Sequence, residues 1–144
     1  MTIAAILKHK GSSVTTVAPA ATIAEVTHVL AAHRIGVVVV VANNGELLGI
    51  LSERDIVRNL AEHGASALDL HAEQVMTRNV STATPSTSVV DATARMTAGR
   101  FRHLPVLDQG RIIGLVSIGD VVKARISQQE EEVDSLKAYV AGGP

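Results

Sequence analysis

Apolar and polar positions follow one another along the first half of this chain in an order that predicts five elements. A short apolar run is followed by apolar residues at helical spacing, then by two apolar runs around an Asn-Asn-Gly turn, and then by another amphipathic stretch. This pattern predicts a strand, a helix, a hairpin of two strands and a closing helix. The first strand is expected at 14–17 and the helix from the Thr22–Glu25 capping box onward. The hairpin strands are expected at 36–42 and 47–51, and the closing helix from Ser52 to about Gly64.

The second half of the chain repeats this order. Its first strand is expected at 80–82, its first helix from Ser88 to about Ala98, and its hairpin strands at 104–107 and 112–116. Its closing helix is expected from Ser117 onward. The closing segments agree best, because the residues Gly45, Gly49, Ser52 and Asp55 recur 65 residues later as Gly110, Gly114, Ser117 and Asp120. A repeat of this length cannot bury its apolar face alone, so the two copies are expected to cover each other.

We therefore expect an α/β (α+β) fold in which two tandem β-α-β-β-α repeats pack sheet to sheet about a pseudo-twofold axis. The first repeat, with its N-terminal segment, is expected at 1–66, the second at 67–126, and a helical tail at 127–144. Val133, Leu136 and Val140 recur at helical spacing in this tail, which is expected to cover its own core or a dimer seam. Two matching crevices between the repeats are where polar residues would carry function.

Composition excludes several classes of site. The 13 basic residues balance the 14 acidic ones, which argues against a dedicated nucleic-acid binder. There is no cysteine, so disulfides, cysteine zinc sites and cysteine nucleophiles are excluded, and the six histidines lack metal-ligand spacing. Only Phe101 and Tyr139 are aromatic, so any bound base would lie in an aliphatic slot. The apolar runs are too short for a bilayer or a signal peptide, and a soluble cytoplasmic protein is expected.

The order of elements, with a proline-marked first strand and a closing Gly-apolar-apolar-Ser-x-x-Asp, resembles the CBS domain, named after cystathionine β-synthase. Two in tandem look like a Bateman module, and the resemblance covers residues 10 to 125. The segments Lys10-Gly11, Ser52-Glu-Arg-Asp55, Arg102-His-Leu-Pro105 and Ser117-Ile-Gly-Asp120 are similar to the stand-alone bacterial CBS-pair signal-transduction proteins. The resemblance implies a non-catalytic regulatory homodimer that binds AMP, ADP, ATP, NAD or S-adenosylmethionine between its repeats and signals to an unidentified protein. The alternative is a dimerising scaffold without a small-molecule ligand.

The two Ser-x-x-Asp pairs, Ser52/Asp55 and Ser117/Asp120, have two interpretations. Serine with an acid three residues later is a helix capping box, and the chain has further pairs of this kind, such as Ser88/Asp91. The pairs at 52 and 117, however, directly follow a hairpin strand, and the free N–H groups of such a junction favour anionic or hydroxyl-rich ligands. The resemblance implies that the aspartate holds a ribose and that the serine lies near the ribose or phosphate. Both interpretations can hold together.

Basic residues near the second hairpin are candidates for phosphate contact. Arg102 and His103 precede an expected strand, where they form either a solvated basic edge or, as the resemblance implies, a phosphate-binding pair. The corresponding positions of the first repeat are expected to be Ile35 and Gly36, so the two crevices should differ. Arg54 lies in a first helical turn, where it opposes the helix dipole unless a phosphate or a neighbouring carboxylate offsets it.

The resemblance also implies which residues surround an adenine base. Segments just before the first strand of each repeat form the walls, and residues in the first hairpin strands lie close by. The residues concerned are Lys10, Ser12, Arg78, Val80, Val38 and Pro105, of which the last two are expected to be equivalent. No nucleophile–base pair or phosphate-binding glycine loop is visible, so an enzyme is not expected.

Overall fold

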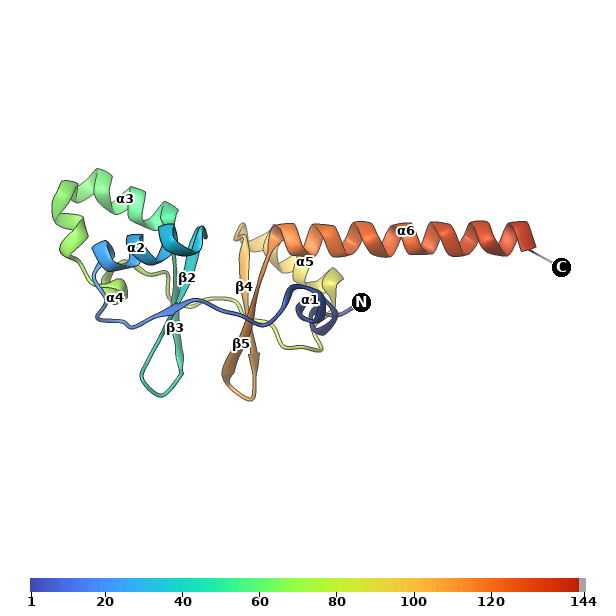
Figure 1. Cartoon of the computed structure of the whole chain (residues 1–144), viewed down its shortest axis with the longest axis horizontal. Helices are drawn as coiled ribbons and strands as arrows, with labels where there is room; N and C mark the ends of the chain where they lie inside the picture. Colours follow the sequence, from blue (N-terminus) through green and yellow to red (C-terminus); the bar gives the residue numbers. More distant parts are fainter. Residues whose placement is uncertain (143–144) are drawn as a thin grey trace. The chain divides into compact units, whose positions relative to one another are not determined.

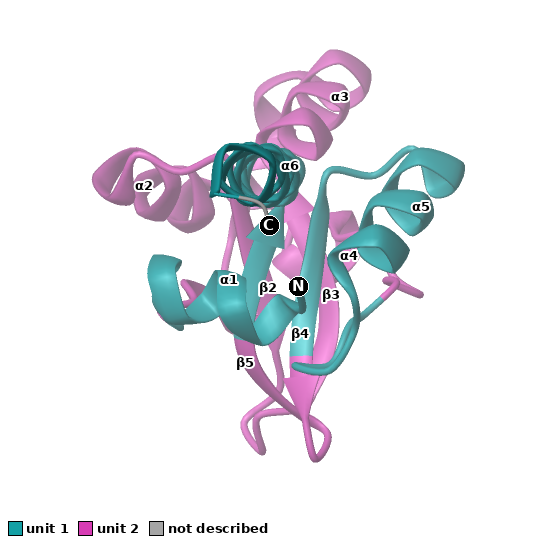
Figure 2. Cartoon of the chain, turned by 90° about the vertical axis from the view of Figure 1, so that its right-hand side faces the viewer, with its two compact units in different colours: residues 1–12, 82–106, 114–144 teal, residues 13–81, 107–113 magenta. Residues whose placement is uncertain are grey.

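The computed structural model describes residues 1–142 and shows helices mixed with two small sheets (Figure 1). The chain divides into two compact units that interleave along the sequence (Figure 2). Unit 1 comprises residues 1–12, 82–106 and 114 onward, and unit 2 comprises residues 13–81 and 107–113. The tail expected at 127–144 is described as far as residue 142, and its last two residues lie outside the described part.

Unit 2 holds the three-stranded sheet. Its elements are β1 (Thr16–Val17), α2 (Ile23–His33), β2 (Val37–Val41), β3 (Leu47–Ser52), α3 (Glu53–His63), the 3-10 helix η1 (Gly64–Asp69) and α4 (Ala72–Val75). The strand order is β1-β2-β3, with β1 parallel and β3 antiparallel to β2. The Thr22 hydroxyl accepts a hydrogen bond from the backbone N–H of Glu25 and so begins α2, as predicted. Val26 and Leu30 of α2 join Val38 and Leu51 in a buried core.

A close approach of two backbone segments stabilises unit 2 at Gly49. A Cβ atom at this position would lie 2.6 Å from the carbonyl oxygen of Thr77 and 2.8 Å from the sulfur of Met76. Thr77 also exchanges backbone hydrogen bonds of 2.8 and 3.1 Å with Ile50. Only glycine leaves room for this contact, so the second glycine of the repeated motif, Gly49, has a packing role.

Unit 1 holds the two-stranded hairpin and three helices. Its elements are α1 (Ile3–Lys10), α5 (Val89–Gly99), β4 (His103–Asp108), β5 (Arg111–Ser117) and α6 (Ile118–Gly142), and the tip of the hairpin groups with unit 2. The sequence pattern did not predict α1. Its first N–H groups, those of Ile3 and Ala4, donate to the carbonyl oxygens of Thr87 and Pro85 at 2.9 and 3.0 Å. A segment remote in sequence therefore satisfies the orphan donors of this helix.

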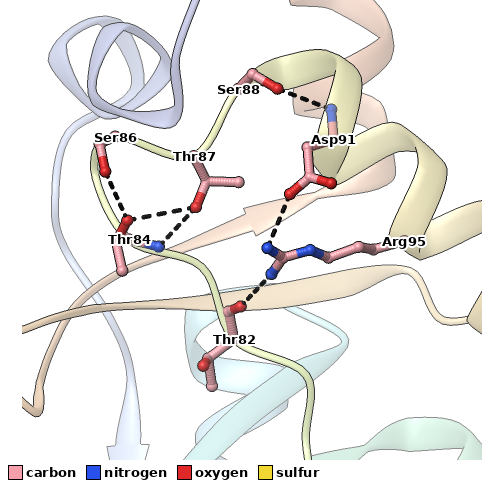
Figure 3. Close-up of polar contacts among 7 residues, drawn as sticks. All are labelled: Thr82, Thr84, Ser86, Thr87, Ser88, Asp91 and Arg95. Atoms are coloured by element: carbon pink, nitrogen blue, oxygen red, sulfur yellow. Dashed lines mark hydrogen bonds and ion pairs between the residues drawn. The ribbon is translucent and has the colours of Figure 1, made fainter.

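The strand predicted at 80–82 is wrong, and the polar residues that directly follow it form a turn at 84–87 and a helix cap at Ser88. Figure 3 shows Thr84 bonding to Ser86 and Thr87, Ser88 accepting from the N–H of Asp91, and Arg95 joining the carbonyl oxygen of Thr82 (2.7 Å) to the carboxylate of Asp91 (2.8 Å). Serine and threonine side chains that bond locally compete with strand pairing. The remaining strand-like contact is a single parallel bridge between Ala83 and Val106.

The bridge at Ala83 corrects the alignment of the two repeats. Val17 pairs with Val40, and the matching residues 66 positions later are Ala83 and Val106. Pro105 is therefore equivalent to Val39 rather than to Val38. An irregularity between Val40 and Val41 accounts for the change of offset between the repeats, from 66 residues in these strands to 65 in the closing segments. By the same shift, the equivalents of Arg102 and His103 are Gly36 and Val37, which are also uncharged.

The polar run after Ile126 does not interrupt the last helix. α6 is continuous from Ile118 to Gly142, because the run from Gln128 to Glu132 consists of good helix formers. None of the described helices is long and apolar enough to span a membrane.

Candidate functional site

The junction between β5 and α6 is a capping box. The backbone N–H of Ser117 donates to Oδ2 of Asp120 at 2.8 Å, and the N–H of Asp120 donates back to the Ser117 hydroxyl at 3.1 Å. The equivalent junction in unit 2 has the same reciprocal bonds between Ser52 and Asp55, at 3.0 and 3.3 Å. The capping interpretation therefore holds at both places.

Lys10, at the end of α1, gives Asp120 a second partner. Its ammonium group donates to Oδ2 of Asp120 at 2.6 Å and to the carbonyl oxygen of Leu115 at 2.8 Å. Gly114 permits this arrangement, because a larger residue would meet Leu7 of α1 at 2.7 Å. Within residues 1–142, no hydrogen bond reaches Oδ1 of Asp120. The carboxylate therefore uses one oxygen in the protein and has the other available as an acceptor.

Two pKa values near this ion pair are shifted. Burial alone would raise the pKa of Asp120, but hydrogen bonds from Lys10 and from the Ser117 N–H, with the Lys10 charge, outweigh it and hold that pKa below its usual range. Burial lowers the pKa of His103, the Lys10 and Arg102 charges lower it further, and Asp120 opposes them. At neutral pH the cluster therefore contains an ionised aspartate, an ammonium group and a neutral imidazole.

A pocket of about 500 Å³ opens beside the ion pair, between α1 and α6. This volume lies in the range of small-molecule sites. Its walls are Met1, Ala5, Ile6, His9, Lys10, Asp120, Lys123, Ala124, Ser127 and Glu131. Lys10 and Lys123 bring positive charge to the pocket, Asp120 and Glu131 bring negative charge, and the small apolar residues provide aliphatic surface. The pocket thus combines a free carboxylate oxygen with cations in one unit.

Sequence reasoning included Lys10 and Asp120 but missed the other residues of the pocket. Lys123, Ser127 and Glu131 follow Asp120 at helical spacing, which is a signal that the sequence did contain. The residues of α1 had no such signal, because the sequence pattern had not predicted that helix.

The corresponding carboxylate of unit 2 has different surroundings. Oδ2 of Asp55 accepts from the N–H and the hydroxyl of Ser52, and Oδ1 lies 3.9 Å from Arg58. The residue 66 positions after Lys10 is Met76, so the repeat offers no equivalent ammonium group there. The side chain of Asp55 is 13% exposed, against 25% for Asp120. The two aspartates are therefore not equivalent, as the broken symmetry of the sequence predicted.

The other predicted site residues have varied surroundings. In unit 1, Ser12 and Arg102 are exposed and Pro105 is buried. In unit 2, Val38 is buried in the core and Val80 is partly buried. Arg54 is exposed and has no ion-pair partner among the described residues, while Arg78 donates to the carbonyl oxygen of Glu73 at 3.0 Å. The structure thus brings together Lys10, His103, Ser117 and Asp120 in unit 1, and Ser52 with Asp55 in unit 2.

Two solved structures similar to this chain contain adenosine compounds. The CBS domain pair of protein MJ0100, in complex with 5′-methylthioadenosine and S-adenosyl-L-methionine, is 26% identical with a TM-score of 0.78, covering 89% of this chain and 98% of that one. A CBS domain protein from Pyrobaculum aerophilum, complexed with AMP, is 28% identical with a TM-score of 0.74, covering 83% of this chain and 89% of that one.

Other comparisons give higher identities. A CBS-domain containing protein from Agrobacterium tumefaciens is 44% identical with a TM-score of 0.82, covering 86% of this chain and 92% of that one. The mitochondrial CBS domain-containing protein CBSX3 of Arabidopsis thaliana is 40% identical over 77% of this chain, which spans 56% of that relative's length. The family model of the CBS domain matches residues 10–62 and again 72–127. The chain therefore belongs to the CBS domain family and carries two CBS domains in tandem.

Proposed function

We propose that this chain is a regulatory module that binds an adenosine-containing ligand in the pocket between α1 and α6 of unit 1. The observation that carries the proposal is the Asp120 carboxylate, which faces this pocket with one oxygen uncommitted within the described chain and with Lys10 beside it. The AMP complex and the S-adenosylmethionine complex of two similar CBS proteins support the same ligand class.

Each part of such a ligand has a chemical counterpart in the pocket. Oδ1 of Asp120 is suited to accept hydrogen bonds from the two ribose hydroxyls. Lys10 and Lys123 provide charge for the phosphate, and the N-terminus of α6 adds N–H groups and a favourable dipole. Ala5, Ile6 and Ala124 offer aliphatic surface to the base, which fits a chain with almost no aromatic residues.

Lys10 would turn from Asp120 toward the phosphate when the ligand binds. The ion pair is partly exposed, since the Lys10 side chain is 39% accessible. Exposed pairs contribute only about 0–1 kcal/mol, so little stability is lost when this contact loosens. Lys10 would thereby exchange its contact with Asp120 for a charge-assisted hydrogen bond to the phosphate.

Binding of the ligand is proposed to act as a signal rather than to begin a reaction. A ligand shifts a module between arrangements only by the difference of its affinities for them. We propose a homodimer that passes this shift to a regulated protein, with AMP, ADP, ATP or NAD as the ligand. The exposed apolar side chains of α6 support the dimer and also favour the alternative of a ligand-free dimerising scaffold.

Thermal unfolding with added nucleotides tests the proposal against the scaffold. A ligand present at about 100 times its dissociation constant adds roughly 2.7 kcal/mol to the free energy of unfolding. We expect at least one of AMP, ATP and NAD to raise the melting temperature, whereas inorganic phosphate at equal concentration should have a much smaller effect. An unchanged melting temperature with all three nucleotides at millimolar concentration would favour the scaffold.

The affinity for AMP should increase as the pH falls from 8 to 6.5. In the ligand-free protein, burial and the charges of Lys10 and Arg102 lower the pKa of His103, although the charge of Asp120 acts in the opposite direction. A bound phosphate would raise this pKa again, because its negative charge favours the protonated imidazole. Because the pKa is higher in the complex, binding takes up protons and strengthens as protons become available. Calorimetry in buffers of different ionisation enthalpy measures this uptake. His103→Gln should abolish it, and an unchanged uptake in that variant would remove His103 from the phosphate site.

A further inference from the structure

Among residues 1–142, the outer part of α6 has no packing partner in its own unit. Its buried residues, Val121 and Ala124, lie near the start of the helix, and every residue from 129 to 142 is exposed. Figure 1 shows α6 continuing well past the other helices of unit 1. An isolated helical segment of this length is only marginally stable in water, so a partner is needed to keep it ordered.

The large exposed aliphatic residues of this helix form one stripe with a seven-residue repeat. Ile126, Val133 and Val140 are spaced by seven residues. Val122 lies four residues before Ile126, and Leu136 lies three residues after Val133. They occupy the a and d positions of a coiled coil, and Gln129 fills the remaining d position. These side chains are 47–73% exposed, although all of them are large and apolar. The stripe is therefore an unpartnered seam.

We propose that this stripe pairs with the same segment of a second copy of the chain, as a parallel, in-register, two-stranded coiled coil. The inference does not depend on ligand binding, and it gives the proposed homodimer a surface and an orientation. Val121 and Ala124, which pack on the helix's own unit, fall at the c and f positions, away from the stripe. Pairing through the stripe therefore leaves the fold of unit 1 unchanged.

Charges beside the stripe fit this partner. In a parallel coiled coil, each g position faces the e position five residues later on the other helix. Arg125 of one copy would then face Glu130 of the other, and Glu132 would face Lys137. Both kinds of pair bring opposite charges together, and the two-fold symmetry forms each of them twice. A second copy of this chain is thus complementary to the seam in both shape and charge.

Two features of the stripe indicate the parallel orientation. The a positions Ile126, Val133 and Val140 are all β-branched, which favours parallel two-stranded coils. In register, the two Gln129 side chains face each other, and an amide can both donate and accept a hydrogen bond. In an antiparallel pair, a d position faces an a position, so the Gln129 amide would lie against Val133 or Ile126 without a partner.

Because the chain has no cysteine, a single introduced cysteine reports the geometry directly. Gln129→Cys should form an intermolecular disulfide rapidly under mild oxidation, since parallel d positions place the two Cα atoms within disulfide range. The matched control is Ala138→Cys, an exposed f position on the outer side of the helix, which should cross-link far more slowly. Failure of Gln129→Cys to cross-link, or equal rates at both positions, would overturn the inference.

Sedimentation of charged variants tests the seam itself. Leu136→Asp should raise the dimer dissociation constant by at least roughly 100-fold, because two carboxylates would face each other in an apolar seam. Ala138→Asp, on the outer side of the helix, should leave the dimer dissociation constant unchanged. Glu130→Lys should weaken the dimer roughly tenfold, and adding Arg125→Glu should restore it. A dimer unaffected by Leu136→Asp would contradict the coiled coil alone. A wild-type chain that stays monomeric would contradict the homodimer as well, and neither result bears on nucleotide binding.

Discussion

Replacing Asp120 by asparagine is expected to weaken the binding of AMP by about 10- to 150-fold. Hydrogen bonds to a charged acceptor contribute about 1.5–3 kcal/mol, and the neutral amide replaces the carboxylate without a change of shape. Lys10 loses its ionic partner in the same variant, but this partly exposed pair is broken in any case when Lys10 turns to the phosphate, so its loss offsets at most about 0–1 kcal/mol of the effect. Titration calorimetry of the wild-type protein and the variant measures the difference.

The control for this variant is Asp91→Asn. Asp91 belongs to the same Ser-x-x-Asp pattern in unit 1 and lies next to the Ser88 cap and Arg95, outside the walls of the pocket. Its replacement should leave the affinity for AMP unchanged. Unfolding in urea should show small losses of stability for both variants, because each loses a partly exposed ion pair, with Lys10 for Asp120 and with Arg95 for Asp91, and such pairs contribute about 0–1 kcal/mol. Equal affinities for wild-type and Asp120→Asn protein would reduce Asp120 to a helix cap.

Gly49→Ala is expected to lower the free energy of unfolding by about 1–3 kcal/mol, the usual range for overpacking. The new methyl group would meet the Thr77 carbonyl oxygen at 2.6 Å, and this oxygen cannot move without disturbing its hydrogen bond to Ile50. An alanine in a strand would otherwise stabilise the fold slightly relative to glycine. Urea denaturation should therefore show a lower midpoint.

Gly114→Ala is the matched comparison in the second repeat. The methyl group there would meet the end of the Leu7 side chain at 2.7 Å rather than backbone. Because Leu7 can adopt another rotamer, the loss of stability should be clearly smaller than at Gly49. An equal loss in both variants would show that the distinction between backbone and side-chain contacts is wrong.

Much of the fold could be predicted because its signals are local. Side-chain caps at Thr22, Ser52 and Ser88, of which Ser52 forms a full capping box, fixed the starts of three helices, and the turns at Asn43 and Asp108 fixed both hairpins. The closing Ser-x-x-Asp pairs were predictable for the same reason, since both partners lie within one helical turn. The strand at 80–82 failed because the segment pairs with β4 only through a single bridge at Ala83, and the carbonyl oxygen of Thr82 bonds to Arg95 instead. Apolar spacing reports neither contact.

The partner of Asp120 could not be derived from local pattern. Lys10 and Asp120 lie 110 positions apart, and their contact depends on α1, a short helix whose first N–H groups bond to a remote segment. The close packing of Leu7 on Gly114 then brings Lys10 to the junction. The resemblance had implied that Lys10 lines a site, whereas the ion pair and the pocket along α6 emerged only from tertiary structure.

A crystal structure of the protein grown with AMP tests the central claim most directly. The account predicts a nucleotide in unit 1 with its ribose hydroxyls on Oδ1 of Asp120 and its phosphate within reach of Lys10. A fully occupied nucleotide elsewhere, with Lys10 still bound to Asp120 and the pocket between α1 and α6 filled by solvent, would contradict it.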